Sequence, residues 1–398
     1  MDGVSAGEQA LAQLLEQAHR LAPEDLADRV RSATAHLGVA DAAVHLVDYD
    51  QVALRPLRPG AAGELPLDTT AAGRAFRTLD PQVEDAGAGA ATLWVPLLDG
   101  VERLGVLQTE LAAERAGDPL VRRRLDAVAA LVAELLLTKG LLGDTFQAVS
   151  RRRSMSLAAE MQWQVLPPIT GGTERVTVAG IVEPCYEVGG DAFDYALSTR
   201  VIRFAIFDGM GHGLEAATLS TVAVAAYRHG RRSGLDLVGT AESIDGALTG
   251  VFATTRFVTA VLAELDVTTG CLRWLNAGHP PPLLVRDGRV VRHLEAPPRT
   301  PLGIRPGAVP VELGEAELRP GDRVFLYTDG IVEARSADGE FFGVERLERF
   351  VVRETTGVDV LQEAMRRLKN AVLDHQDGRL QDDASQLLVE WHPDGGRR

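Results

Sequence analysis

The first third of the chain changes from helical to strand-like spacing of its apolar residues. After a frayed tail at residues 1–8, apolar positions three and four apart predict helical structure from Gln9 to about Leu37. A strand at Ala43–Val47, a short helix at Thr69–Arg77 and a hairpin around Asp99-Gly100 follow. This order of elements predicts an α+β domain over residues 9–140.

A mostly helical stretch is predicted next, from Leu125 to about Gln164. Four apolar residues recur there every seven positions: Val128, Leu135, Leu142 and Val149. Two interpretations stay open, because the repeat is short and is interrupted at Lys139-Gly140. It is either a terminal helix packed on its own domain or a dimeric signalling helix that leads into the next domain. We assign residues 141–168 to a helical linker, which Pro167-Pro168 ends.

Strands predominate after residue 168. They are predicted at Val176–Val182, Val201–Phe207, Thr259–Asp266, Leu272–Asn276, Arg323–Tyr327 and Ser385–Glu390, with a hairpin at Leu283–Leu294. Helices are predicted at Leu214–Arg231, Asp236–Phe252, Val344–Arg353 and Val358–Leu373. Because the helices are set apart from the runs of strands, residues 169–392 are expected to form sheets packed together with helices outside.

The composition is that of an ordinary globular protein, with 45% hydrophobic and 24% charged residues in 398. The net charge of −15 argues against binding to a nucleic-acid backbone, which requires clustered cations. Cys185 and Cys271 form neither a disulfide framework nor a zinc pattern. No signal-peptide pattern is visible, and the longest apolar run, Ala127–Leu137, is shorter than the ~20 residues of a membrane span. We therefore expect a cytoplasmic protein with no membrane or nucleic-acid partner.

Acidic residues beside glycines carry the strongest chemical signal. Asp208 and Asp329 each follow an apolar strand, Asp382-Asp383 precedes one, and Asp191 follows two glycines. Carboxylates that converge at strand ends form an oxygen-rich site for Mg²⁺ or Mn²⁺. Burying several like charges together would be costly without such a counter-ion. The pattern predicts a metal-dependent hydrolase.

Two cations about 3.5–4 Å apart would activate a bridging water and stabilise phosphoryl transfer without a side-chain nucleophile. The motifs of other hydrolase classes are missing from the sequence: it has no Gly-x-Ser-x-Gly elbow, no phosphatase-type cysteine loop and no Gly-x-x-x-x-Gly-Lys-Ser/Thr phosphate loop.

Residues from about 160 to 391 resemble the SpoIIE/RsbU-type branch of the PPM family, the metal-dependent serine/threonine phosphatases. The matching segments, in family order, are Glu160–Pro168, Val188–Asp194, Phe207–Gly213, Asn276–Pro282, Tyr327–Ala334 and Asp382–Ser385. The resemblance implies an α/β/β/α sandwich with a dinuclear Mn²⁺ or Mg²⁺ centre at one edge of the sheets.

The resemblance also implies roles for individual residues. Asp208 would bridge both metals, and the backbone carbonyl of Gly209 would complete one coordination sphere. Asp329 and Asp382 would hold the second metal, and Asp191 would bind directly or through water. Catalysis would depend on Asp208 and Asp329 through a metal-activated water.

Five further residues of these segments have weaker assignments. Asp194 and Asp383 are the next metal-ligand candidates, although Asp194 could instead cap a turn. A structural role is favoured for His212 and His279, which lie in tight Gly- or Pro-flanked turns. Asn276 and His279 could alternatively line the substrate groove.

The N-terminal region resembles a GAF domain in its element order and in Thr70–Phe76 and Trp94–Leu107. GAF domains sense small molecules or other signals, and many dimerise, so the resemblance implies a small-molecule or protein signal and a homodimer. The polar or ligand residues typical of cyclic-nucleotide and haem binding are not found. His19, His36 and His45 are interpreted as ordinary surface or core histidines.

Together the resemblances imply a protein serine/threonine phosphatase gated by an N-terminal sensor domain. In the family the usual substrate is a phosphorylated anti-sigma-factor antagonist of the STAS fold, within a bacterial partner-switching pathway. One alternative is a non-catalytic signalling adaptor that retains the phosphatase fold. A metal-dependent nuclease or nucleotide phosphohydrolase is disfavoured by the acidic charge and by the lack of base-stacking aromatic residues near the site.

Overall fold

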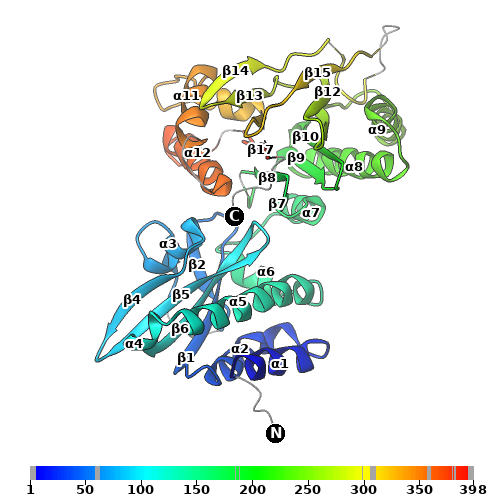
Figure 1. Cartoon of the computed structure of the whole chain (residues 1–398). Coiled ribbons are helices and arrows are strands. Elements are labelled where there is room, and N and C mark those ends of the chain that lie inside the picture. The colour runs from blue at the N-terminus through cyan, green and yellow to red at the C-terminus, as the bar shows by residue number, and fades with distance from the viewer. Residues whose placement is uncertain are drawn as a thin grey trace. The chain divides into compact units, whose positions relative to one another are not determined.

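The chain forms two compact units, Met1–Ser154 and Met155–Arg398. Figure 1 shows the computed structural model of the chain. The structure describes residues 6–58, 63–183, 185–187, 189–297, 299–304, 311–355, 360–378, 380 and 382–392. Residues 1–5 of the predicted tail, Val188 of one motif and Val358 at a predicted helix start lie outside the described residues. Within the described part, no helix is both long and apolar enough to cross a membrane.

The first unit is built on one antiparallel sheet of six strands in the order β3-β2-β1-β6-β5-β4 (Figure 1). These strands are β1 (Asp41–Val47), β2 (Ala53–Pro56), β3 (Leu65–Pro66), β4 (Gln82–Gly87), β5 (Ala90–Asp99) and β6 (Glu102–Ala112). The predicted hairpin around Asp99-Gly100 is confirmed, because β5 pairs with β6 on either side of it. Sequence reasoning missed β2, β3 and β4.

Helices cover both faces of this sheet. They are α1 (Ala6–Ala18), η1 (Pro23–Asp25), α2 (Leu26–Ala35), α3 (Ala71–Thr78), α4 (Ala113–Ala116), α5 (Pro119–Gly140) and α6 (Thr145–Ser150). The main core packs α1, α2 and α5 on one face, and on the other face Phe76 of α3 packs with Trp94 of β5. The predicted frayed tail is wrong for residues 6–8, which form the first turn of α1. The Thr70 side chain caps α3 by accepting a hydrogen bond from the Gly73 N–H.

The heptad pattern does not continue through a single helix. Val128 and Leu135 are buried in the core of the first unit, within α5. Leu142 is 67% exposed and lies beyond the end of α5. Three separate helices, α5, α6 and α7 (Leu157–Val165), occupy the stretch. For α5 the structure therefore supports the interpretation of a terminal helix packed on its own domain.

The second unit contains two stacked antiparallel sheets (Figure 1). One has the order β15-β12-β11-β10-β9, with β9 (Gly189–Ala196), β10 (Val201–His212), β11 (Val258–Asp266), β12 (Cys271–Ala277) and β15 (Gly314–Glu317). The other has the order β14-β13-β16-β17-β8-β7, with β7 (Thr170–Thr173), β8 (Val176–Ile181), β13 (Leu283–Arg286), β14 (Arg289–His293), β16 (Arg323–Tyr327) and β17 (Gln386–Trp391). The strands β7, β9 and β15 were not predicted.

Three apolar cores hold these layers together. The central core lies between the sheets and includes Phe204, Trp274 and Val389. The helices α8 (Gly213–Arg232) and α9 (Leu237–Phe252) cover the first sheet, and α11 (Val344–Thr355) and α12 (Leu361–His375) cover the second. The strands are apolar on both faces because each sheet is covered on both sides. The expected α/β/β/α sandwich is confirmed.

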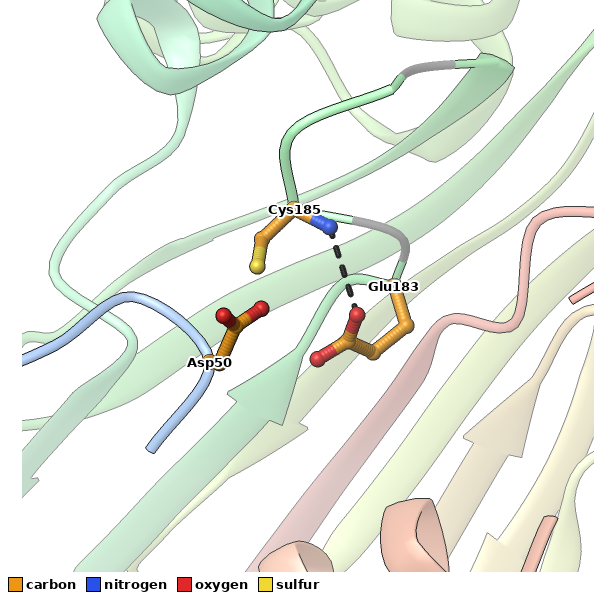
Figure 2. Close-up of side chains that lie close together, drawn as sticks. All are labelled: Asp50, Glu183 and Cys185. Atoms are coloured by element: carbon orange, nitrogen blue, oxygen red, sulfur yellow. Dashed lines mark hydrogen bonds between the residues drawn. The ribbon is translucent and has the colours of Figure 1, made fainter. Parts of the chain in front are cut away.

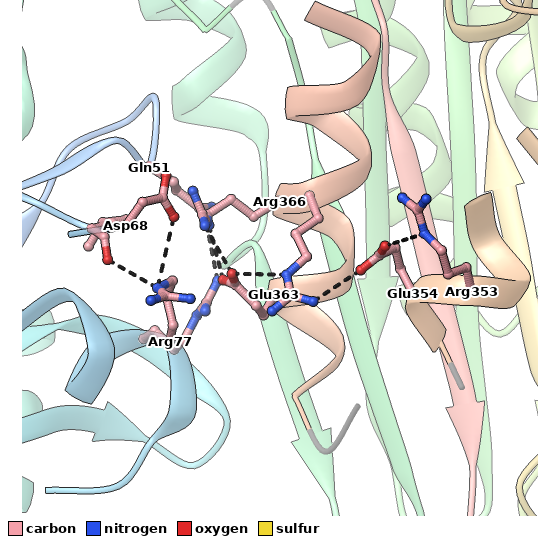
Figure 3. Close-up of polar contacts among 10 residues, drawn as sticks. Gln51, Asp68, Arg77, Arg353, Glu354, Glu363 and Arg366 are labelled. Atoms are coloured by element: carbon pink, nitrogen blue, oxygen red, sulfur yellow. Dashed lines mark hydrogen bonds and ion pairs between the residues drawn. The ribbon is translucent and has the colours of Figure 1, made fainter. Parts of the chain in front are cut away.

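Ion pairs stabilise the helices α11 and α12, which cover the second sheet. Within α12, the Arg366 guanidinium donates to the Glu363 carboxylate at 2.9 Å, and at the end of α11 Arg353 donates to Glu354 at 2.7 Å (Figure 3). Glu354 also accepts a hydrogen bond from Arg367 at 3.1 Å. Because Arg367 belongs to α12, this contact fastens the end of α11 to its neighbour.

Candidate metal centre

Strand register places Asp191 and Asp208 side by side in the first sheet. The two residues are direct partners in the β9–β10 ladder, and Asp208 is also opposite Thr259 of β11. The Asp191 carboxylate accepts a hydrogen bond from the Thr328 hydroxyl at 2.7 Å. Thr328 follows β16 of the other sheet, so Asp191 points into the space between the sheets.

The second sheet contributes three further carboxylates at the same edge. Asp329 begins α10 (Asp329–Val332), separated by one residue from the end of β16, and Asp382 and Asp383 precede β17. Tyr327 at the end of β16 pairs with Gln386 at the start of β17, so the two segments meet. The Asp191 N–H donates to the Asp383 carboxylate at 3.4 Å and joins the two sheets. We call Asp191, Asp208, Asp329, Asp382 and Asp383 the carboxylate cluster.

The cluster is electrostatically strained without a cation. Burial, followed by the nearby charges of Asp329, Asp382 and Asp383, raises the pKa of Asp208 to about 7. Burial and the charges of Asp383 and Asp208 hold the pKa of Asp191 well above its ordinary value. Burial also raises the pKa of Asp383 to about 6 and that of Asp329 above its usual range. These like charges favour a bound cation.

Glycines allow the backbone segments of the cluster to approach closely. A Cβ atom on Gly190 would lie 2.0 Å from the carbonyl oxygen of Gly209. A Cβ atom on Gly330 would lie 1.8 Å from the carbonyl oxygen of Asp383. Neither position can hold a side chain without moving backbone. The glycines beside the aspartates are therefore required by packing as well as by turns.

The strand ending predicted at Phe207 is wrong. β10 continues to His212, and Asp208 and Gly209 stay paired with Thr259 and Val258 of β11. The apolar pattern stops at Phe207, but the backbone ladder does not depend on apolar side chains. Asp208 is consequently held within a paired strand rather than in a loop after it.

The structure does not bring Asp194 to the cluster. Side chains alternate along a strand, so Asp191 and Asp194 of β9 point to opposite faces of the sheet. The Asp194 carboxylate accepts from Arg228 at 2.9 Å and from Arg231 at 2.5 Å, and both arginines lie on α8. It lies within β9 rather than capping a turn, and it fastens α8 to the sheet.

Replacing Asp194 by asparagine is expected to lower stability while leaving the affinity for divalent cations within about twofold of wild type. Removing one partner of a buried ion pair typically costs about 3–5 kcal/mol, because the remaining charge is uncompensated. Thermal unfolding and Mn²⁺ titration would measure the two effects. A metal affinity that falls at least tenfold, in a variant that stays folded at the temperature of the titration, would instead favour a ligand role for Asp194.

Of the histidines considered as site residues, His212 is exposed at the start of α8 and His279 is buried. The Asn276 side chain donates to the His279 carbonyl and accepts from the His279 N–H, both at 2.8 Å, and so closes the loop after β12. Burial lowers the pKa of His279 to about 4. The ring contacts Thr259 and the backbone carbonyl of Tyr327. These contacts agree with a structural role for Asn276 and His279.

Sequence reasoning missed the polar residues that hold the carboxylates. The Thr328 hydroxyl bonds Asp191 and accepts from the Ser385 N–H at 2.9 Å, and the Gln162 amide donates to the Asp191 carbonyl. Thr328 lies inside the Tyr-Thr-Asp-Gly segment, in which only the neighbouring aspartate was predicted to be a site residue. The position of Gln162, in a helix 29 residues before Asp191, offered no local signal.

The loop after β8 joins α7 to the sheets of the second unit. The Cys185 N–H donates to the Glu183 carboxylate at 3.3 Å (Figure 2). The Trp163 indole donates to the Cys185 carbonyl at 2.9 Å, and Lys369 of α12 lies 3.4 Å from Glu183. With the Gln162 contact, these bonds connect α7 to the strand that carries Asp191.

Several known proteins are similar to this chain. Residues 198–392 match the family model for Stage II sporulation protein E (SpoIIE). Phosphoserine phosphatase RsbP of Bacillus subtilis (strain 168) is 25% identical over 191 residues, 46% of this chain and 46% of RsbP. Phosphoserine phosphatase RsbU of the same organism is 22% identical over 239 residues, 60% of this chain and 70% of RsbU.

Among solved structures, the RsbU and RsbW domains of Rv1364c from Mycobacterium tuberculosis show 23% identity and a TM-score of 0.49, over 56% of this chain and 63% of that one. This chain spans less than half the length of RsbP. The residues matched by the family model include Asp208, Asp329, Asp382 and Asp383. The second unit therefore contains a SpoIIE-type domain, over residues 198–392.

Proposed function

We propose that this protein is a metal-dependent phosphatase that hydrolyses phosphoserine or phosphothreonine in a protein substrate. The observation that carries the proposal is the carboxylate cluster, in which two sheets bring five acidic side chains to one edge. The description of RsbP and RsbU as phosphoserine phosphatases supports the same reaction class.

The chemistry of the cluster fits two divalent cations, Mn²⁺ or Mg²⁺. All of its donors are oxygens, and burial together with their mutual repulsion raises the pKa of several of them, so a bound hard cation would lower the free-energy cost of keeping them ionised. Asp208, the Gly209 carbonyl, Asp191, Asp329 and Asp382 would hold the cations, with Asp383 beside them. When bound, the cations supply a water of lowered pKa and offset the charge of the phosphoryl group.

The protein's own part is to hold these oxygens in place. Asp208 is fixed between two neighbouring strands, Thr328 orients Asp191, and three backbone N–H groups bond Asp383. A cysteine nucleophile has no support, because Cys185 is buried and burial raises the pKa of the Cys271 thiol. The reaction would therefore depend on positioning and electrostatics rather than on a covalent intermediate.

Hydrolysis of p-nitrophenyl phosphate and of a phosphoserine peptide tests the proposal. We expect the full chain to turn over both substrates with Mn²⁺ or Mg²⁺ and neither with EDTA. Turnover by residues 151–398 but not by the full chain would indicate an enzyme held inactive by its N-terminal unit. Folded protein that binds Mn²⁺ but is inactive in both forms would favour the signalling adaptor.

The finer proposals concern the partner and the regulation. We propose a phosphorylated anti-sigma-factor antagonist of the STAS type as substrate, in a partner-switching pathway. We further propose that the N-terminal unit is a GAF-like sensor domain that binds a small molecule or protein signal, gates the phosphatase and forms a homodimer. The six-stranded sheet with helices on both faces, folded as a unit of its own, supports the sensor proposal.

A further inference from the structure

One buried histidine connects the strands that carry the carboxylate cluster. His279 lies in the loop after β12 and is 5% exposed. Its Nδ1 atom lies 2.8 Å from the Thr259 hydroxyl, and its Nε2 atom lies 3.0 Å from the Tyr327 carbonyl oxygen. Thr259 belongs to the first sheet and Tyr327 to the second, so the imidazole ring spans the space between them.

The two contacts determine which ring nitrogen carries the proton. A backbone carbonyl can only accept a hydrogen bond, so the Nε2 atom must donate to Tyr327. In the neutral ring the Nδ1 atom is then an acceptor for the Thr259 hydroxyl. This single tautomer uses both nitrogens and fixes the plane of the ring.

Each partner of His279 leads directly to an aspartate of the cluster. Thr259 is opposite Asp208 in the β10–β11 ladder, and its side-chain oxygen contacts the Asp208 carboxyl group. Tyr327 is the last residue of β16, two positions before Asp329. The chain of contacts from Asp208 through Thr259 and His279 to Tyr327 therefore joins the strands on which Asp208 and Asp329 depend.

We propose that His279 is a positioning residue for the metal centre. It fixes the Thr259 side chain against Asp208, and by holding the end of β16 it sets the separation between Asp208 and Asp329. The loop itself is fixed by the paired hydrogen bonds between Asn276 and the His279 backbone. This role rests on the proposed metal-dependent function, and it requires no direct contact between His279 and a metal.

Mn²⁺ affinity of the full chain, measured by calorimetric titration, tests the role. Thr259→Val removes the hydroxyl while keeping the shape of the side chain. His279→Gln keeps a donor for Tyr327 but removes the ring nitrogen that faces Thr259. We expect each variant to bind Mn²⁺ about 10–100-fold more weakly, the loss typical of partners that orient metal ligands. Thr259→Ser retains the hydroxyl and should recover most of the loss.

The double variant Thr259→Val/His279→Gln separates positioning from general damage. If His279 acts through Thr259, the double variant should lose little more affinity than the more affected single variant. Losses that multiply in the double variant would overturn the proposal. Thr109→Val is a matched control, because it removes a buried threonine hydroxyl that bonds the Leu93 carbonyl in the first unit. Its Mn²⁺ affinity should equal that of wild type.

Asp208→Asn distinguishes failure of this inference from failure of the proposed function. If wild type binds no Mn²⁺, both fail. If Asp208→Asn abolishes binding while Thr259→Val and His279→Gln bind as wild type, only the positioning role fails. Should His279→Gln not fold, the comparison of Thr259→Val with Thr259→Ser still decides whether the hydroxyl matters, and equal affinities would overturn the proposal.

Discussion

Replacing Asp208 by asparagine is expected to lower metal-dependent phosphatase turnover by more than about 100-fold. Losing a residue that only orients a metal ligand typically costs up to about 100-fold, and a ligand itself should cost more. Asp208 is the cluster residue paired with β9 on one side and β11 on the other, and it is influenced by the charges of Asp329, Asp382 and Asp383. Its amide analogue keeps the shape but removes the charge that would hold the cations. Steady-state rates with saturating Mn²⁺ would measure the loss.

The same substitution is expected to stabilise the metal-free protein, and more so at pH 8 than at pH 5. The pKa of Asp208 is raised to about 7 in the folded protein, so the folded state binds its proton more tightly than the unfolded chain does. The ionised carboxylate therefore costs stability, and this cost increases as the pH rises from the ordinary aspartate value toward 7 and is complete above it. Asparagine carries no such cost at any pH.

Thermal unfolding in EDTA at the two pH values would measure this effect. Because other groups titrate in the same range, the informative quantity is the difference in melting temperature between variant and wild type at each pH. Asp194→Asn provides the contrast, since it should destabilise the protein. A wild type that is more stable than Asp208→Asn at pH 8 without metal would contradict the electrostatic account of the cluster.

Gly190→Ala is expected to reduce turnover by about 100-fold and to lower the melting temperature by several degrees. The new methyl group would lie 2.0 Å from the Gly209 carbonyl oxygen, so the backbone of β9 or β10 must move by about 1 Å or more. Displacements of this size in a catalytic site can cost about 100-fold in rate. Overpacking typically costs about 1–3 kcal/mol. Kinetics and thermal unfolding of the same preparation would measure both.

Gly246→Ala is the matched control for Gly190→Ala. Gly246 lies within α9, and no atom other than those of its chain neighbours and of the adjacent helix backbone lies within 4 Å of the added methyl group. Alanine should therefore leave turnover unchanged and stabilise the helix by about 0.5–1 kcal/mol. Wild-type turnover and melting temperature in Gly190→Ala would show that the close approach of β9 and β10 is not required.

Local sequence patterns were sufficient to predict those site residues that lie beside a recognisable strand. The carboxylates at the end of β16 and the start of β17 could be recognised because apolar runs end or begin beside them. The same approach failed for β9, which is buried on both faces and shows no alternation of polar and apolar residues. Without that strand, the opposite orientations of Asp191 and Asp194 could not be inferred.

Other parts of the site depend on pairings between distant residues. Asp208 contacts Thr259 only because β10 and β11 pair in one particular register, and Thr259 contacts His279 only because β12 returns beside β11. A shift of one residue would reverse the facing side chains. The strand register cannot be inferred from the residues next to these positions in the sequence. Sequence reasoning accordingly placed His279 in a turn without finding its partners.

The position of β17 has a consequence for protein synthesis. This strand lies in the interior of its sheet, between β16 and β8, and Asp382 and Asp383 immediately precede it. A ribosome-bound chain lacking residues beyond about 380 would have β8 and β16 without the strand that pairs with both, and two of the five carboxylates would be missing. Translation must therefore pass Trp391 and release that segment from the exit tunnel before the cluster can assemble. Until then the folded part of a nascent chain would hold only three carboxylates of the cluster, Asp191, Asp208 and Asp329.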